Sequence, residues 1–452
     1  MTDPLVPSKT PFNYNIGVNY ESWENGRTGY SITADLNQIA QYFGLIKTYH
    51  DVAVGTANPN IPQIDPTQQQ VISYVANTPN VQLVMGTLNS ALAQDGFGKP
   101  WSAGLMTSSA YTDSWVQMII GAFGSKQAVL THLKMILLGN EVDANGPPPG
   151  DPVFGSYQGW INEAFNNLAA SLQKAGLGSI PVSTSIANYG PTNAIAVGTA
   201  AYIQQNWSSA WDGGMPIVYF NQYTPGPPSA PMSGTDYQPV INYFESLVTT
   251  FNGKLEPFIG ETGYSTYYGQ ANQITVYNHI VSWLNSQHGS GGKTVPLFAF
   301  DAFDQPTRTP ALEVNFGIFA ENPSHQPIGL KPGLSLPSWS KAPIVKLKSD
   351  FNNDFSSDIL VQSASGQVGV WSVDEAQVQS MSLVTQGGNL MSAVSGWTVL
   401  ESGDFNGDGY ADILWQTPGG GLAVWNMQGA QVISSSIACP RSPLTCRRAI
   451  VR

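Results

Sequence analysis

The sequence predicts an α/β fold: a (β/α)8 TIM barrel followed by a small all-β repeat module, like part of a propeller. Three observations predict it. Eight short, almost continuously apolar segments recur between residues 15 and 303, as expected for strands that are buried on both faces. Amphipathic helical segments separate them, which is typical of a barrel of alternating strands and helices. Beyond residue 343 the chain repeats itself at a spacing of 54 residues.

The strands and helices are predicted from the apolar pattern. The predicted strands lie at 15–20, 44–50, 81–89, 134–142, 180–188, 215–223, 255–264 and 295–303. Ser31 is placed to cap a first helix in which Leu36 lies on the apolar face. The segments 157–178, 236–253 and 271–289 are amphipathic, and each ends at a glycine.

An open, doubly wound sheet is the alternative arrangement of such elements. Dinucleotide-binding sheets of that kind carry a Gly-rich phosphate loop after the first strand, and this sequence has none there. Residues 305–335, where the eighth helix is due, are rich in proline and glycine. We therefore expect the barrel to be least regular in this last segment.

Composition divides the chain into three parts. Residues 1–325 carry the barrel pattern and are predicted to form the barrel domain. Residues 326–343 are rich in proline, glycine and serine and are predicted to be a linker. Residues 344–452 contain the two repeats and an atypical, basic tail.

The charge and composition exclude several classes of protein. The 452 residues carry a formal charge of −12, and only 11% of them are charged, against about 25% in typical domains. Because no basic cluster precedes the C-terminus, we expect no nucleic-acid partner. No apolar run is long enough to span a membrane. We expect a secreted or cell-surface protein, although this chain contains no signal peptide.

Two glutamates follow apolar strands in the same way. Glu141 ends the predicted strand 134–142, and Glu261 lies in the strand 255–264. In a (β/α)8 barrel the carboxyl ends of all strands meet at one mouth, so both side chains are expected to point into it. Two carboxylates that face each other across a groove are the groups that glycoside hydrolysis requires. A single glutamate at a strand end is more often a solvated loop residue, but the pair favours catalysis.

The motifs around these glutamates resemble a known enzyme family. "LLGNEV" is similar to the acid/base motif of glycoside hydrolase family 17, the clan A family of β-1,3-glucanases and glucanosyltransferases, and "GETGY" is similar to its nucleophile motif. Further similar segments are "GVNY", "IKTYH", "VMGTLN", "FAFDAFDQP" and "FGIF". The resemblance covers residues 12–330. It implies a retaining mechanism with a covalent glycosyl-enzyme.

The resemblance implies roles for individual residues. Glu141 would be the acid/base, Glu261 the nucleophile, and Asn140 would hydrogen-bond the sugar 2-hydroxyl. "NQY" at 221–223 matches the family's Asn-x-Tyr, so Asn221 and Tyr223 would lie in the substrate site, with Tyr223 positioning Glu261.

Further substrate contacts are expected from aromatic residues and one aspartate. Tyr20, Tyr49, Trp101 and Phe303 are candidate platforms on which sugar rings stack, although core packing explains each of them equally well. Asp304 matches the family's strand-eight aspartate. The family then has Glu and Lys where this chain has Gln305 and Arg308, a departure that bears on substrate specificity.

The repeats contain acidic loops with calcium-loop spacing. In the second repeat, Asp404, Asn406, Asp408 and Asp412 occupy positions 1, 3, 5 and 9, glycine occupies position 6, and Tyr410 offers a carbonyl. In the first repeat, Asp350, Asn352, Asp354 and Asp358 keep the spacing, but Phe355 replaces the glycine. The pattern resembles FG-GAP/VCBS repeats and predicts structural Ca²⁺. The alternative is a pair of solvated acidic turns.

We therefore expect a retaining glycoside hydrolase that acts on β-glucan, specifically an endo-β-1,3-glucanase. A β-1,3-glucanosyltransferase or a clan A enzyme for another β-glucan linkage is the alternative within enzymes, and a glycan-binding adhesin is the alternative outside them. The expected partner is a polysaccharide. No cofactor is expected for catalysis, since the five histidines form no ligand cluster in the sequence.

Overall fold

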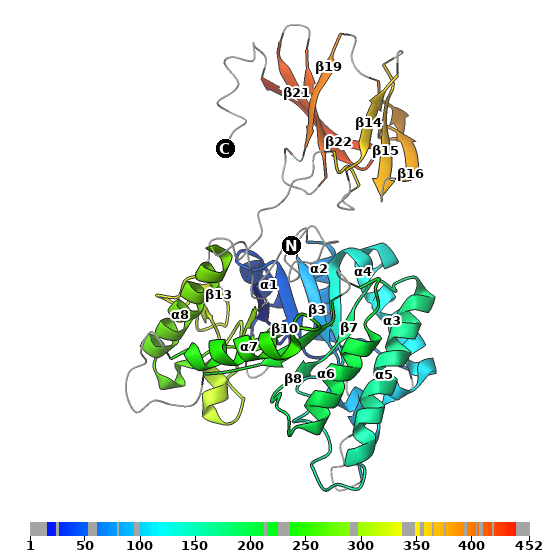
Figure 1. Ribbon diagram of the computed structural model, residues 1–452. Coiled ribbons are helices and arrows are strands. Elements are labelled where there is room, and N and C mark those ends of the chain that lie inside the picture. The colour runs from blue at the N-terminus through cyan, green and yellow to red at the C-terminus, as the bar shows by residue number, and fades with distance from the viewer. Residues whose placement is uncertain are drawn as a thin grey trace. The chain divides into compact units, whose positions relative to one another are not determined.

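The chain folds into two compact units, residues 1–343 and residues 344–452. The computed structural model describes residues 16–23, 27–52, 61–78, 81–94, 100–211, 215–224, 236–289, 297–336, 349–352, 357–363, 366–374, 377–392, 396–403, 405, 410–417 and 420–439 (Figure 1). Within these residues, no helix is both long and apolar enough to cross a membrane.

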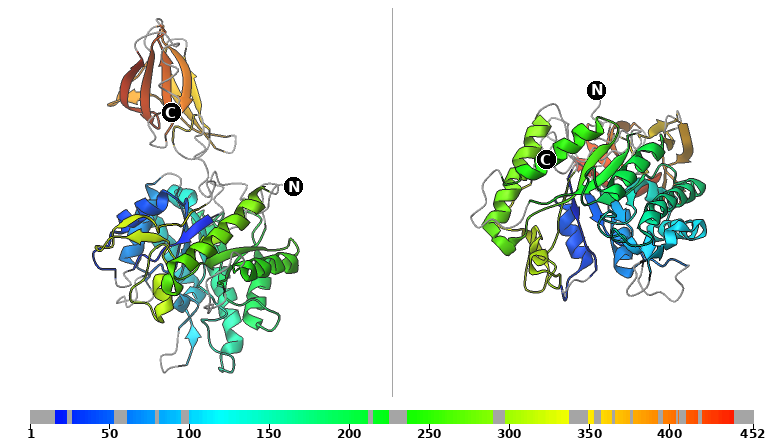
Figure 2. Two further views of the ribbon diagram at one scale, coloured as in Figure 1. Left: turned by 90° about the vertical axis from the view of Figure 1, so that its left-hand side faces the viewer. Right: turned by 60° about the horizontal axis from the view of Figure 1, so that its bottom comes forward.

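The first unit is a closed barrel of parallel strands, seen from two further sides in Figure 2. The strands are β1 (Ile16–Asn19), β2 (Leu45–Thr48), β3 (Gln82–Gly86), β6 (Leu133–Leu137), β7 (Val182–Ser183), β8 (Ser185–Ile186), β9 (Ile217–Asn221), β10 (Glu256–Thr262) and β11 (Leu297–Ala299). Their order is β7-β6-β3-β2-β1-β11-β10-β9-β8. Only Thr184 separates β7 from β8, so the two ends of this order are halves of one strand, and the barrel closes. The predicted (β/α)8 barrel is confirmed.

Helices surround the barrel and begin where the sequence offers a cap. They are α1 (Ile32–Ala40), α2 (Pro66–Ala76), α3 (Ser109–Phe123), α4 (Lys126–His132), α5 (Phe154–Ala175), α6 (Ala194–Asn206), α7 (Gln238–Phe251) and α8 (Gln270–Gly289). The Ser31 side chain accepts the N–H of Ala34 at the start of α1, as predicted. Asp65 caps α2 in the same way, and Gly176 ends α5 with a φ of +77°.

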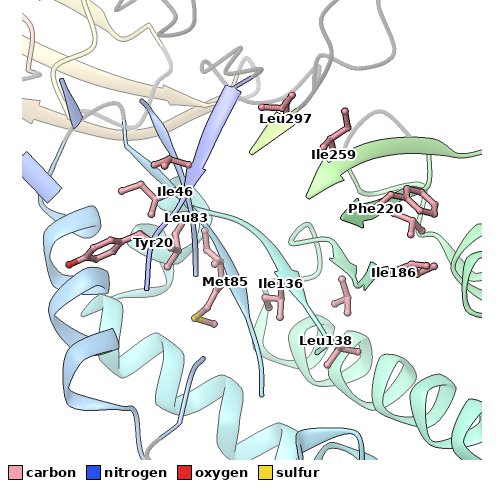
Figure 3. Close-up of a cluster of buried hydrophobic side chains, with 14 of the residues drawn as sticks. Tyr20, Ile46, Leu83, Met85, Ile136, Leu138, Ile186, Phe220, Ile259 and Leu297 are labelled. Atoms are coloured by element: carbon pink, nitrogen blue, oxygen red, sulfur yellow. The ribbon is translucent and has the colours of Figure 1, made fainter. Parts of the chain in front are cut away.

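Alternate residues of each strand face the helices or the barrel interior. The helix-facing side chains, among them Ile46, Leu83, Ile136 and Phe220, are fully buried and form one large cluster with the helices. Figure 3 shows part of this cluster. The near-continuous apolar pattern of the strands follows from this burial on both faces.

Aromatic rings fill much of the barrel interior. The ring centroid of Tyr219 lies 5.3 Å from that of Phe258 and 5.7 Å from that of Phe298. A Cβ added to Gly17 would lie 2.5 Å from the Phe298 ring, so only glycine leaves room for that ring. This packed interior leaves the carboxyl ends of the strands as the place for a site.

The segment after β11 is irregular, as the sequence predicts. It contains the short 3₁₀ helix η5 (Ala311–Asn315) and the antiparallel hairpin β12 (Phe319–Glu321) and β13 (Pro327–Leu330). The side chain of Leu334 packs against the barrel core. We therefore correct the predicted linker: residues 326–336 belong to the barrel unit, while 337–343 lie outside the described residues.

The described part of the second unit contains two sheets, in which all neighbouring strands are antiparallel except β17 and β22, which are parallel. The first sheet holds β14 (Ile359–Gln362), β15 (Val368–Asp374) and β16 (Gln377–Leu383). The second holds β17 (Thr385–Gln386), β18 (Asn389–Leu390), β19 (Thr398–Gly403), β20 (Asp412–Gln416), β21 (Leu422–Gln428) and β22 (Gln431–Cys439), in the order β18-β17-β22-β21-β20-β19. The strands β14 to β16 and β20 to β22 correspond at the 54-residue spacing, which matches the predicted repeat.

Candidate active site

A cavity of about 620 Å³ lies at the carboxyl ends of the barrel strands. Residues that lie at or directly after the ends of β1, β2, β3, β6, β9, β10 and β11 line it. Glu141 and Glu261 are both among them, so the structure brings the two predicted glutamates into one cavity.

The turn after β6 holds Glu141 in an unusual backbone conformation. Its φ is +51°, and that of Gly139 is +67°. Three consecutive N–H groups donate to neighbouring side chains: Gly139 to Thr87 Oγ1 (3.0 Å), Asn140 to Asn89 Oδ1 (2.7 Å) and Glu141 to Ser185 Oγ (2.9 Å). A left-handed non-glycine residue costs on the order of 1–3 kcal/mol. These hydrogen bonds, to two residues that follow β3 and to one in β8, hold the strained turn in place.

The carboxyl group of Glu141 is suited to donate a proton. Burial and the nearby charge of Glu261 raise the pKa of Glu141 from its ordinary 4.5 to about 7. A hydrogen bond from Asn221 Nδ2 to Glu141 Oε1 (3.1 Å) and the charge of Lys47 act in the opposite direction. A large share of Glu141 is therefore protonated at neutral pH.

Glu261 is held by a donor at each of its oxygens. The Tyr223 hydroxyl donates to Oε2 at 2.7 Å, and Lys47 Nζ donates to Oε1 at 3.2 Å. The residue is only 4% exposed. The two bonds fix the orientation of this carboxylate in the cavity.

Lys47 and two tyrosines lie next to Glu261. Lys47 is fully buried, also donates to the Gly260 carbonyl (3.3 Å), and lies 4.3 Å from the centre of the Tyr49 ring. Burial and the charge of Glu261 raise the pKa values of Tyr49 and Tyr223 well above their ordinary range. Both hydroxyls thus stay protonated and remain hydrogen-bond donors.

The predicted amides flank the acid. Asn140 Oδ1 accepts hydrogen bonds from Ser185 Oγ (2.5 Å) and Asn221 Nδ2 (3.4 Å). This leaves the Nδ2 group of Asn140, which lines the cavity, for a ligand oxygen. Asn221 is 3% exposed and donates to Asn140 and Glu141, so it holds the Glu141 side chain and does not line the cavity itself.

A group of charged residues forms another part of the wall. Arg308 pairs with Glu21 and lies 3.7 Å from Glu313, with its guanidinium 5.1 Å from the centre of the Phe300 ring. All four residues line the cavity, as does Trp23. Of these, only Arg308 was singled out from the sequence. Glu21 and Trp23 directly follow the first strand, a position that could have identified them.

Two predicted aromatic platforms do not line this cavity. Tyr20 is 1% exposed and its hydroxyl donates to Asp35 Oδ2 at 2.9 Å. Phe303 is 1% exposed, and the Arg27 guanidinium lies 4.3 Å from its ring centre. We therefore correct their assignment from substrate contact to core packing. Trp101 also packs against the core.

Asp304 likewise does not line the cavity. It pairs with Lys331 (2.9 Å) and accepts the N–H of Gly317 (2.9 Å), so it ties the hairpin region to the end of β11. Gln305 is 2% exposed and donates to Asp301 Oδ2 at 3.2 Å. Asp301 was not predicted, and burial raises its pKa to about 8.

The acidic loops of the second unit are partly described. Asp358 Oδ2 accepts the N–H of Phe351 (2.8 Å), and Asp412 Oδ2 accepts that of Phe405 (2.9 Å), at equivalent positions of the two repeats. Asp350, Asn352 and Tyr410 are also described, whereas Asp354, Asp404, Asn406 and Asp408 lie outside the described residues. Among the described residues, no group of three acidic, histidine or cysteine side chains is arranged to hold a metal ion.

Comparison with known proteins gives matches for the repeat and to glucan endo-1,3-beta-glucosidases. The model of the FG-GAP repeat matches residues 396–431. The putative glucan endo-1,3-beta-glucosidase GVI of Hordeum vulgare is 25% identical over 277 residues, which cover 52% of this chain and 78% of that protein. The glucan endo-1,3-beta-glucosidase GII of Hordeum vulgare is 25% identical over 317 residues, with coverage of 61% and 89%.

Among solved structures, the chain resembles CJP38, a beta-1,3-glucanase and allergen of Cryptomeria japonica pollen. The TM-score is 0.46 at 18% identity, and the match covers 71% of this chain and 99% of that one. The expected resemblance is confirmed: the chain is similar, at 25% identity, to two glucan endo-1,3-beta-glucosidases of Hordeum vulgare, and residues 396–431 match the FG-GAP repeat.

Proposed function

We propose that this protein is a retaining glycoside hydrolase that cleaves β-glucan, specifically as an endo-β-1,3-glucanase. The observation that carries the proposal is the unequal pair of glutamates in one cavity. Glu141 has a pKa of about 7, while Glu261 is held by Tyr223 and Lys47. A proton donor and an anchored carboxylate are the two groups that double displacement requires.

In the first step, a Glu261 oxygen attacks the anomeric carbon. The bond from that carbon to the glycosidic oxygen breaks, and Glu141 gives its proton to the departing oxygen. In the second step, water attacks the anomeric carbon, Glu141 takes a proton from this water, and the bond to Glu261 breaks. The Asn140 amide, which lines the cavity, is placed to bind the sugar hydroxyl next to the reacting carbon.

The coupling between the two carboxyl groups suits both steps. The negative charge of Glu261 raises the pKa of Glu141 before the reaction. When Glu261 becomes an ester, this charge disappears and the pKa of Glu141 falls. Glu141 therefore holds its proton in the free enzyme, where an acid is needed, and is ionised in the glycosyl-enzyme, where it must accept a proton from water.

The charges of the wall favour a neutral polymer. Four carboxyl groups line the cavity, those of Glu21, Glu141, Glu261 and Glu313, together with the single guanidinium of Arg308. A large share of Glu141 is protonated and Glu21 pairs with Arg308, so the remaining negative charge comes from Glu261 and Glu313. We expect this charge to disfavour uronate or sulfated polysaccharides and to leave neutral glucan as the substrate. The β-1,3 linkage is supported by the names of the two barley homologues.

The test is a product analysis on soluble β-1,3-, β-1,4-, β-1,6- and β-1,2-glucans. We expect reducing ends to appear fastest on the β-1,3-glucan laminarin, and none with the Glu261→Gln variant. Glu163→Gln, an exposed glutamate on α5, is the matched control and should keep wild-type activity. Products longer than the substrate would instead identify a glucanosyltransferase. The absence of activity on every glucan would contradict the proposal.

For the second unit we propose structural Ca²⁺ in the acidic loops and a secreted or cell-surface location. The spacing of acidic residues in both loops and the match to the FG-GAP repeat support the calcium site. Asp412 is buried, and its carboxylate accepts the N–H groups of Phe405 and Met427. These two bonds would fix the orientation of the last acidic side chain of the second loop. Ca²⁺ would neutralise the acidic loop and stabilise this unit.

A further inference from the structure

The loop between β10 and α8 places three tyrosines next to one another. Tyr264 and Tyr268 line the cavity, and Tyr267 contacts Tyr268. The ring centroids of Tyr264 and Tyr268 are 5.6 Å apart, and those of Tyr268 and Tyr267 are 5.1 Å apart. The three rings therefore form a continuous aromatic strip, which begins three residues after Glu261 in the sequence.

The aromatic strip leads from the cavity to the surface. Tyr264 is 3% exposed, Tyr268 is half-buried, and Tyr267 is 57% exposed. Tyr267 is the most exposed aromatic side chain in the described part of the barrel unit. Single exposed apolar residues are common on protein surfaces. This one differs from them because it continues a row of rings that starts inside the cavity.

Hydrogen bonds hold the loop of the aromatic strip in one conformation. The Ser265 side chain accepts the N–H of Tyr267 (3.1 Å), and the Ser265 carbonyl accepts the N–H of Tyr268 (3.3 Å). Asn272 Nδ2 donates to the Tyr268 carbonyl (2.7 Å). Ser265 itself is only 1% exposed. The backbone that carries the rings is thus ordered before a ligand arrives, which lowers the entropic cost of binding.

The cavity is too small for a polymer. Its volume of about 620 Å³ is that of a site for one small molecule. A polysaccharide that is cut within its chain must therefore continue out of the cavity on both sides of the reacting sugar. A β-linked glucosyl unit presents an apolar face of axial C–H groups, and a tyrosine ring is a rigid apolar surface that can pack against such a face.

We propose that Tyr267 and Tyr268 form a binding subsite for a neutral glucosyl unit of the β-glucan chain where this chain leaves the cavity. The inference rests on the proposed function, because it takes β-glucan as the substrate. Tyr267 does not line the cavity and cannot reach the reacting carbon. It therefore binds substrate and transition state equally, and its loss raises KM without changing kcat.

The experiment measures the affinity for laminarin by calorimetry in the Glu261→Gln background, in which no hydrolysis is expected. We expect an added Tyr267→Ala to weaken binding at least about fivefold, and an added Tyr267→Phe, which keeps the ring, to bind as the parent does. The matched control is Val248→Ala, because Val248 is 46% exposed on α7 and does not line the cavity. This control should also bind as the parent does.

A second measurement compares kcat and KM on laminarin with Glu261 intact. We expect Tyr267→Ala to raise KM and to leave kcat and the melting temperature unchanged, whereas a structural defect would lower both of the latter. The inference is overturned if the parent does not bind laminarin, if Tyr267→Ala leaves the affinity unchanged, or if Val248→Ala weakens it equally. If the wild type cleaves no β-glucan but Tyr267→Ala still weakens laminarin binding, the proposed hydrolase activity fails and the subsite stands.

Discussion

Replacing Glu261 by glutamine keeps the shape of the side chain and removes the nucleophilic oxygen. We expect turnover on laminarin to fall by more than about 10³-fold, with the unfolding transition retained. Glu141→Ala should behave differently, because general acid help is worth roughly 10²–10⁴-fold and is least needed when the leaving group is good. The measurement compares laminarin with an activated aryl β-glucoside. Equal losses on both substrates in Glu141→Ala would contradict its role as the acid.

Glu141 also sets the pH dependence. The first step needs protonated Glu141, so we expect activity to fall as the pH rises through about 7. Lys47→Met removes a positive charge that lowers the pKa of Glu141, so this pKa rises and the falling limb moves to higher pH. The turnover number should also drop, since Glu261 loses a donor.

Lys174→Met provides the control for this prediction, because Lys174 is exposed and pairs with Asp113 away from the cavity. Its pH profile should match the wild type. A falling limb that stays in place or moves to lower pH in Lys47→Met would show that Lys47 does not act on Glu141.

At the residue scale, sequence reasoning found the two glutamates that the structure brings into one cavity, and it missed the residues that hydrogen-bond to them. Lys47 was detectable, because a lysine within the apolar run "GLIKTYH" shares its inward direction with Tyr49. The left-handed conformation of Glu141 was not detectable, since it depends on hydrogen bonds to Ser185 and other residues distant in the sequence. Tyr20 and Phe303 were misassigned because the sequence does not show whether an aromatic side chain near a strand end packs in the core or lines the cavity.

At the scale of the elements, the contact of Gly17 in β1 with Phe298 in β11 tests how tightly the barrel interior is packed. Gly17→Ala would place a Cβ 2.5 Å from the Phe298 ring, and overpacking of this kind costs about 1–3 kcal/mol. We expect a loss of that size in the free energy of unfolding of the barrel, measured in urea. Phe298→Leu in the same chain should reduce the loss.

Gly121→Ala is the matched control for Gly17→Ala. It lies in α3, where an added Cβ meets no atom within 4 Å, so it should stabilise the protein by about 0.5–1 kcal/mol. Gly17→Ala without any loss of stability would contradict the packing described for the interior.

The elements that the sequence predicted best are those with a strong apolar pattern. The strands and the capped helix after Ser31 lie close to where the pattern placed them. The hairpin of β12 and β13 was assigned in part to a linker, because proline and glycine weaken any local signal there. Its position depends on tertiary contacts such as the pair of Lys331 with Asp304.

At the scale of the whole molecule, we expect the first unit to carry out catalysis and the second to bind Ca²⁺. Both glutamates proposed for catalysis lie in the first unit, and both acidic loops lie in the second. A chelator should therefore lower the melting temperature of the second unit and leave turnover on soluble laminarin within about twofold, since Ca²⁺ stabilises only the state that binds it. Calorimetry and activity measured on the same sample provide the test.

The acidic loops also allow a residue-specific check on this division. Asp412→Ala leaves the buried N–H of Met427 without its acceptor, which costs on the order of 1–3 kcal/mol. We expect the second unit to melt earlier in this variant and barrel turnover to be unchanged. Loss of turnover on chelation or in Asp412→Ala would show that the metal serves the active site.

The central claim is a double displacement through Glu261, and the stereochemistry of the first product tests it most directly. Proton NMR recorded during the first minutes of laminarin cleavage distinguishes the α- and β-anomers of the new reducing end before they equilibrate. Two inversions at one carbon retain the configuration, so we predict that the β-anomer appears first. An initial excess of the α-anomer would mean that water attacks directly, and the assignment of Glu261 as nucleophile would be wrong.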